Sequence, residues 1–260
     1  MTKRDSVART LSIAAGVAIF CSLLVSSVVL WLRPMQLAYQ SIERNRAVLE
    51  ASRLIEPGLD LADNEIVDRF LVLETRIVDL DTDAFSDAVS PITYDVRAAM
   101  NDPDRTEPIP SELDTASLGR RPVYLPVYLL LDDQRVERIV LPVYGPGMWS
   151  TIHGFISLQA DFATIEGVAF YEHGETPGIG DRILDPAWLA QWRGQPAYDD
   201  SGQLVLRIGA NSTSSTSNSG IDAISGATVT VSAVEDLVRY WLGDDGFGPI
   251  LADLRRGAQQ

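Results

Sequence analysis

The stretch of residues 222–230 reads Asp-Ala-Ile-Ser-Gly-Ala-Thr-Val-Thr and offers the hydroxyl of Thr228 for chemistry. Ser232 and Glu235 match a capping box, which predicts that a helix begins just after this stretch. Free N–H groups and the positive end of a helix dipole favour a phosphate at such a place. Gly226 and Ala227 add little bulk, so a large group could approach the backbone there. Local chemistry alone leaves two interpretations, a phosphate-binding loop or a Thr-rich loop that caps a core helix.

The helix expected after this stretch has one apolar stripe. Its members recur at helical spacing: Val234, Leu237, Val238, Trp241 and Leu242. Gly243 is suited to the end of the helix. We therefore expect the helix to pack on a core, with Thr228 in the loop before it.

Other candidate groups offer less chemistry. His173 and Glu175 lie in a glycine-rich loop without further metal-ligand spacing, so we predict no metal site. Cys21 is the sole cysteine, which excludes an intrachain disulfide and a cysteine-based iron–sulfur site. No Gly-x-Gly-x-x-Gly fingerprint opens a helix after a strand, which argues against direct NADH binding. We predict no acid–base dyad and therefore no catalytic residue.

Composition limits the class of partner. The 260 residues allow one or two domains, and the formal net charge of −15 argues against nucleic-acid binding, which normally requires a basic face.

An apolar N-terminal run predicts a single-pass membrane protein. Residues 11–32 carry no charge, and a run of about 22 residues can cross a bilayer of roughly 30 Å as a helix. Lys3, Arg4 and Arg9 precede it, so the positive-inside rule favours a cytoplasmic N-terminus in residues 1–10. We expect a helical connector over residues 33–55 and a periplasmic domain over residues 56–260, anchored in the lipid of a bacterial inner membrane.

The domain is expected to be α+β, with an antiparallel or mixed sheet and flanking helices. Strand composition occurs over 71–80, 123–131, 136–144, 155–158, 164–170 and 204–208. Pro142 suggests an edge position or the end of its strand. Short helices are expected over 60–70 and 185–193, a glycine turn over 145–150, an exposed loop over 99–118, and a Ser/Thr/Asn loop over 211–220.

The motif at 222–230 resembles the flavinylation motif of flavin-binding subunits of ion-pumping respiratory complexes. Asp222 and Ser225 match the pattern, whereas Ala223 and Val231 replace a frequent Gly and Ser. Four more blocks carry the resemblance: 141–150, 170–178, 185–188 and 243–251. Together with the apolar N-terminal run, they resemble the NqrC family, the C subunits of the sodium-translocating NADH:quinone reductase. Pro146 and Met148 depart from the family's commoner residues.

The resemblance implies an electron-relaying subunit with covalent FMN, whose phosphate a flavin transferase joins to the hydroxyl of Thr228. It also implies that the loop of Glu175 and Thr176 borders the flavin ring and that Ile179 packs against it. The other cofactor-binding candidates are Trp149, Ser225, Gly226, Ala227 and Thr230. Implied partners are Nqr subunits A, B, D, E and F.

Two alternatives are open on the sequence. The first is the related G subunit of the Rnf electron-transport complex, which also carries a Thr-linked flavin. The second is a non-redox, membrane-anchored binding domain in which the Thr-rich loop is only structural.

Overall fold

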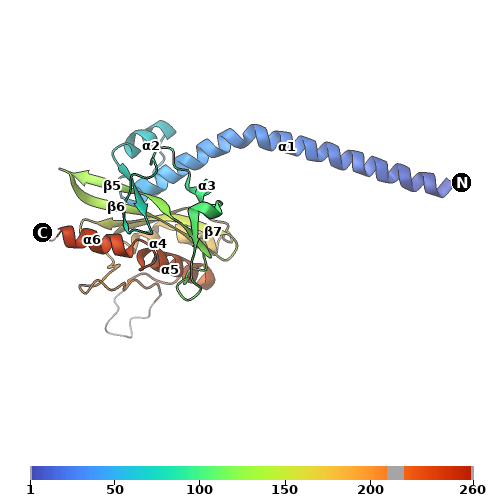
Figure 1. Cartoon of the computed structure of the whole chain (residues 1–260). Coiled ribbons are helices and arrows are strands. Elements are labelled where there is room, and N and C mark those ends of the chain that lie inside the picture. Colours follow the sequence, from blue (N-terminus) through green and yellow to red (C-terminus); the bar gives the residue numbers. More distant parts are fainter. Residues whose placement is uncertain (1, 210–219, 259–260) are drawn as a thin grey trace. The chain divides into compact units, whose positions relative to one another are not determined.

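A computed structural model describes residues 2–209 and 220–258 (Figure 1). The chain forms two compact units, Met1–Glu43 and Arg44–Gln260. Helix α1 (Thr2–Ala51) is continuous through the predicted span and most of the predicted connector. Among the described residues, it is the one helix long and apolar enough to cross a membrane. Most of the Ser/Thr/Asn loop predicted over 211–220 lies outside the described residues.

The second unit is built on a six-stranded antiparallel sheet with the order β2-β1-β5-β6-β7-β8. Its strands are β1 (Glu74–Asp79), β2 (Ala84–Phe85), β5 (Tyr124–Asp132), β6 (Arg135–Pro146), β7 (Thr151–Gln159) and β8 (Ile165–Glu172). A separate two-stranded ribbon pairs β3 (Thr106–Pro108) with β4 (Arg120–Pro122). The predicted α+β class with an antiparallel sheet is therefore confirmed.

The helices of this unit are short, apart from one beside the motif. They are α2 (Asp63–Phe70), α3 (Val96–Met100), α4 (Pro186–Ala190), α5 (Thr228–Leu242) and α6 (Gly248–Ala258), with 3-10 turns η1 (Pro103–Arg105) and η2 (Gly180–Leu184). In Figure 1, α4, α5 and α6 lie on the same side of the sheet. The segment expected as an exposed loop over 99–118 instead contains the end of α3, η1 and β3.

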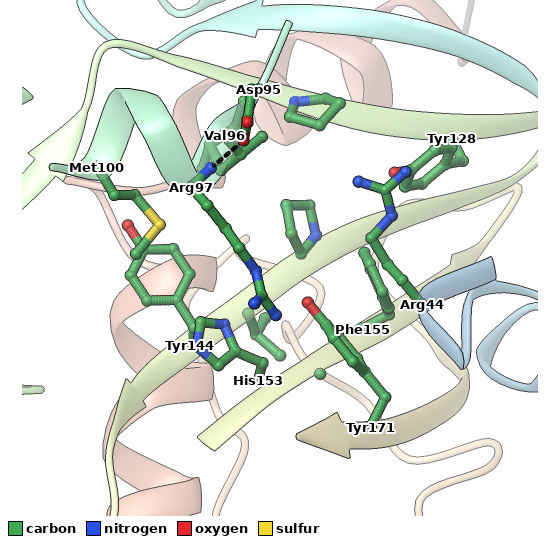
Figure 2. Close-up of a pocket in the computed structure, with 15 residues that line it drawn as sticks. Arg44, Asp95, Val96, Arg97, Met100, Tyr128, Tyr144, His153, Phe155 and Tyr171 are labelled. Carbon is green, nitrogen blue, oxygen red and sulfur yellow. Dashed lines mark hydrogen bonds between the residues drawn. The ribbon is translucent and has the colours of Figure 1, made fainter. Parts of the chain in front are cut away.

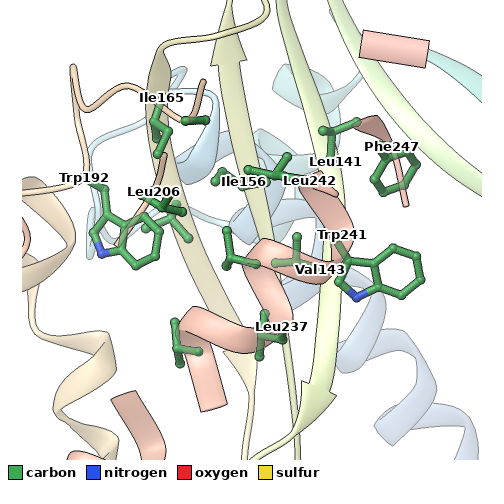
Figure 3. Packing of buried hydrophobic residues seen from close by; sticks show 14 of the residues in the cluster. Leu141, Val143, Ile156, Ile165, Trp192, Leu206, Leu237, Trp241, Leu242 and Phe247 are labelled. Carbon is green, nitrogen blue, oxygen red and sulfur yellow. The ribbon is translucent and has the colours of Figure 1, made fainter. Parts of the chain in front are cut away.

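The main core lies between the sheet and α5. The predicted apolar stripe of α5 is buried, and its members pack with strand residues such as Leu141, Val143 and Ile156 (Figure 3). The indole Nε1–H of Trp241 donates to the carbonyl of Tyr144 at 2.7 Å, which ties the C-terminal half of α5 to β6.

Two strand predictions are wrong. Pro142 lies within β6, an inner strand, and pairs with Phe155 of β7. The β5–β6 ladder ends at Tyr128 and Val140, just before register would bring Pro126 opposite Pro142; since proline lacks an N–H, the ladder loses donors there.

The segment 204–208 belongs to no strand of the described residues and makes only an isolated bridge between Leu204 and Tyr198. Side chains of α5 form hydrogen bonds with backbone groups of this segment. The amide of Ile208 donates to the Glu235 carboxylate at 3.0 Å, and Arg239 donates to the carbonyl of Leu206 at 2.7 Å.

Candidate functional site

Three segments meet at one end of the sheet. Because β6, β7 and β8 are antiparallel neighbours, the turn 147–150 between β6 and β7 and the loop after β8 emerge at the same end. The N-terminus of α5 joins them through a hydrogen bond from Thr230 to Glu175. These segments carry all the residues that the sequence assigns to cofactor binding.

Thr228 is the first residue of α5, not part of a loop before the helix. The predicted capping box of Ser232 and Glu235 is therefore wrong, and the helix begins four residues before Ser232. The carboxylate of Glu235 cannot serve as a cap because it accepts hydrogen bonds from Arg207 and from the amide of Ile208.

The start of α5 lacks a side-chain cap. Its N-cap residue is Ala227, and the first helical bond runs from the amide of Val231 to the carbonyl of Ala227 at 2.9 Å. Within the described residues, the amides of Thr228, Val229 and Thr230 donate to no backbone carbonyl. Such unsatisfied donors at the positive end of a helix form a site for an anion.

The motif before α5 is held in place by its apolar residues. Ile221, Ile224 and Ala227 are buried, while Asp222, Ser225 and Thr228 are exposed. The backbone of Asp222 is fixed on both sides: its carbonyl accepts from Trp188 Nε1 at 2.8 Å, and its amide donates to Gln191 at 2.7 Å.

Gly226 supplies the turn into the helix. Its φ of +84° lies in the left-handed region that favours glycine, and a Cβ there would meet no atom within 4 Å. The structure therefore requires glycine at this position for its backbone conformation, whereas the sequence analysis had considered only its small size.

Glu175 and Thr230 are buried beneath this surface, with exposed fractions of 4% and 2%. The hydroxyl of Thr230 donates to Glu175 Oε2 at 2.6 Å, and the amide of Trp149 donates to Glu175 Oε1 at 3.3 Å. These two bonds join the turn 147–150, the loop after β8 and the first turn of α5. The amide of Glu175 donates to His173 Nδ1 at 3.2 Å, which gives His173 a role in shaping the loop.

Large apolar side chains lie exposed on the same three segments. Trp149 is 68% exposed, Ile179 is 47% exposed and Val229 is 57% exposed. The indole Nε1–H of Trp149 donates to Thr176 Oγ1 at 3.0 Å, which sets the direction of the ring. An isoalloxazine ring is planar and has an apolar dimethylbenzene part, so these side chains fit a flavin beside an anion-binding helix end.

A groove of about 490 Å³ runs beside Thr228. It is lined by Thr115, Ala116, Ser117, Pro146, Gly147, Thr228, Val229, Ser232, Ala233 and Asp236. The contribution of residues 115–117 was missed by sequence reasoning, because only tertiary contact brings that loop to α5. Among the described residues, no group of three or more His, Cys, Asp or Glu side chains could hold a metal ion.

A smaller hollow of about 120 Å³ lies where the β5–β6 ladder ends (Figure 2). Its lining includes the aromatic side chains of Tyr128, Tyr144, His153, Phe155 and Tyr171, and Figure 2 shows Arg44 and Arg97 on opposite sides of it. Arg97 forms an ion pair with Glu172. Burial lowers the pKa of His153 in this wall, so the imidazole is neutral near pH 7. None of the residues assigned to cofactor binding lines this hollow.

Comparison with known proteins identifies an FMN-binding domain over residues 147–243, which include every residue assigned to cofactor binding. The chain is 37% identical to the C subunit of the Na(+)-translocating NADH-quinone reductase of Pseudomonas aeruginosa over 99% of each chain. It is 33% identical to the C subunit of the same enzyme of Vibrio alginolyticus over 98% of each chain.

Two solved structures are similar to this chain. The crystal structure of NqrC from Shewanella oneidensis is similar with a TM-score of 0.71 and 34% identity, covering 82% of this chain and 96% of that one. The C subunit from Parabacteroides distasonis is similar in fold, with a TM-score of 0.63 and 22% identity, covering 85% of this chain and 96% of that one.

Proposed function

Because the chain belongs to the NqrC family, the C subunits of the Na(+)-translocating NADH-quinone reductase, we propose that it relays electrons through an FMN attached covalently to Thr228. In the attachment, the Thr228 oxygen forms a bond to the FMN phosphorus of a flavin donor in which this phosphate is activated as a phosphoanhydride. The phosphoanhydride bond breaks, and the departing phosphate group takes up the proton of the hydroxyl. A flavin transferase makes the resulting phosphodiester, and the chain gains the mass of FMN less one water.

The observation that carries the proposal is the position of Thr228 at the uncapped start of α5. Its side chain is exposed, and three backbone amides beside it have no carbonyl partner among the described residues. A phosphate on the Thr228 oxygen would supply the missing acceptor, since anions bind at helix N-termini. The attached phosphate would thus take the place of a capping side chain, which the N-cap residue Ala227 does not provide.

The flavin ring is proposed to lie against the exposed apolar side chains around this helix end. Trp149 and Ile179 provide apolar surface, and Thr176 orients the indole. Ser225, Gly226 and Ala227 shape the approach to the attachment point. Glu175 and Thr230 act from below this surface, since both side chains are buried.

When bound, FMN supplies the redox chemistry, because its ring accepts and releases electrons. The chain's own residues attach the flavin, orient its ring and set the polarity around it. Electron relay requires no general acid or base from the chain.

Within the complex, the proposed partners are Nqr subunits A, B, D, E and F. NADH oxidation, quinone reduction and the sodium path are assigned mainly to those subunits. The apolar N-terminal helix is a membrane anchor, and we place its N-terminus in the cytoplasm and residues 56–260 in the periplasm. Outside the cytoplasm little free FMN is available, so a covalent bond prevents loss of the cofactor.

Expression with and without a flavin transferase tests the attachment. Wild-type protein made with the transferase should show flavin fluorescence on a denaturing gel, and Thr228→Ala should show none. Ser232→Ala is the matched control, since Ser232 lines the same groove one helical turn further along. A fluorescent Thr228→Ala band would contradict the proposal.

The alternative assignment to the G subunit of an Rnf complex is tested with native partners. The similar proteins of Pseudomonas aeruginosa and Vibrio alginolyticus are C subunits of the quinone reductase, which favours that enzyme. A purified complex should reduce quinone in a sodium-dependent reaction. Copurification with an Rnf complex that lacks this activity would contradict the assignment.

A further inference from the structure

We propose that Glu175 is a positioning residue that fixes the turn of Trp149 relative to the flavin-bearing end of α5. The inference deepens the proposed function and rests on it for the role of Thr228. We call the three residues Glu175, Thr230 and Trp149 the Glu175 clasp. The Thr230 hydroxyl and the Trp149 amide both donate hydrogen bonds to the Glu175 carboxylate.

The carboxylate of Glu175 is buried. In the part of the chain that the structure describes, no ion pair involves it, and its hydrogen-bond donors are the Thr230 hydroxyl and the Trp149 amide. A buried carboxylate is costly unless hydrogen bonds compensate it, so each donor matters to the geometry of its segment. Thr230 lies two residues from Thr228, and Trp149 carries the most exposed indole of the site.

Gly147 and Gly180 both lie so close to Glu175 that a larger residue at either position would collide with it. A Cβ on Gly147 would lie 2.4 Å from Glu175 Oε1. A Cβ on Gly180 would lie 2.9 Å from Glu175 Cβ and 3.0 Å from Thr230 Oγ1. The carboxylate is therefore enclosed between the two loops, and it cannot move without displacing one of them.

The indole of Trp149 is held by the neighbour of Glu175 in the sequence. The residue after Glu175 is Thr176, whose hydroxyl accepts the indole Nε1–H at 3.0 Å. Glu175 thus holds the amide of Trp149 directly, while its neighbour holds the ring. Loosening the carboxylate should release both the backbone of the turn and the orientation of the ring against the flavin.

Thr230→Val and Thr230→Ser form a matched pair that tests the clasp in the full chain without flavin. Valine keeps the β-branched shape and removes the donor, whereas serine keeps the donor. Hydrogen exchange at the Trp149 amide should become roughly tenfold faster in Thr230→Val and stay near the wild-type rate in Thr230→Ser. Equal exchange rates in wild type, Thr230→Val and Thr230→Ser would overturn the proposal, as would an equally large increase in both variants.

A second readout uses protein whose flavin loading has been matched by intact mass. A neighbouring indole quenches flavin fluorescence by electron transfer, so native fluorescence per bound flavin should rise in Thr230→Val and return toward wild type in Thr230→Ser. A merely structural Thr230 would leave this yield unchanged. If wild-type protein carries no flavin at all, the proposed function fails, while the exchange experiment still decides whether the clasp exists.

Discussion

Replacing Gly226 by alanine should weaken the fold and slow flavin attachment together. The φ of Gly226 is +84°, and a Cβ would meet no atom within 4 Å, so the penalty arises from backbone conformation alone. Holding an L-residue in the left-handed region costs roughly 1–2 kcal/mol, and the reduced freedom of alanine in the unfolded chain offsets about 0.4–1 kcal/mol of that. We therefore expect the free energy of unfolding to fall by about 1 kcal/mol.

Gly194 provides a matched control away from the site. Its φ is +75°, and a Cβ there also meets nothing within 4 Å, so Gly194→Ala should cost a similar amount. Urea unfolding of the full chain in detergent measures both losses, and the rate of FMN incorporation by a flavin transferase measures function. Only Gly226→Ala should load more slowly, because only Gly226 directs the chain into the turn that presents Thr228.

Asparagine tolerates positive φ better than alanine, so Gly226→Asn should recover part of the loading rate. The reasoning is refuted if Gly226→Ala is as stable as wild type. It is also refuted if Gly226→Ala and Gly194→Ala load flavin equally fast.

Two further predictions concern buried groups. Gly147→Ala places a Cβ 2.4 Å from Glu175 Oε1 and 2.8 Å from Ile152 Cδ1, so urea unfolding should show a loss of about 1–3 kcal/mol, and no loss would contradict the enclosure of Glu175. Burial lowers the pKa of His153 from 6.5, so between the folded-state pKa and 6.5 the unfolded chain binds a proton that the folded chain does not. Stability should therefore fall as pH drops through 6.5 and level off below the folded-state pKa; His153→Phe should flatten that part of the profile, and an unchanged profile would contradict the assignment.

The apolar face of α5 was predictable because its pattern is local in the sequence. The motif at 222–230 and the apolar stripe from Val234 to Leu242 lie in one continuous stretch, and the stripe is buried as predicted. The start of α5 was not predictable from the capping pattern, because Glu235 binds Arg207 and the amide of Ile208, which are distant in sequence. The strand predicted over 204–208 was wrong for the same reason, since Glu235 and Arg239 of α5 bind backbone groups of that segment.

The support beneath the site also depends on contacts that no local pattern encodes. Glu175 and Thr230 lie 55 positions apart and are joined only in the fold. The sequence marked both as site residues through a family resemblance, but not that their side chains are buried against each other. The loop of residues 115–117 carried no signal at all, since its place beside Thr228 is set by packing.

Tandem mass spectrometry of the peptide that spans residues 222–230 tests the central claim most directly. Native protein, denatured and digested, should carry the mass of FMN less one water on Thr228. Ser225 and Thr230 provide internal alternatives, since both are hydroxyl residues of the same peptide. An FMN mass on either of them, or an unmodified peptide from protein made with an active flavin transferase, would contradict the account.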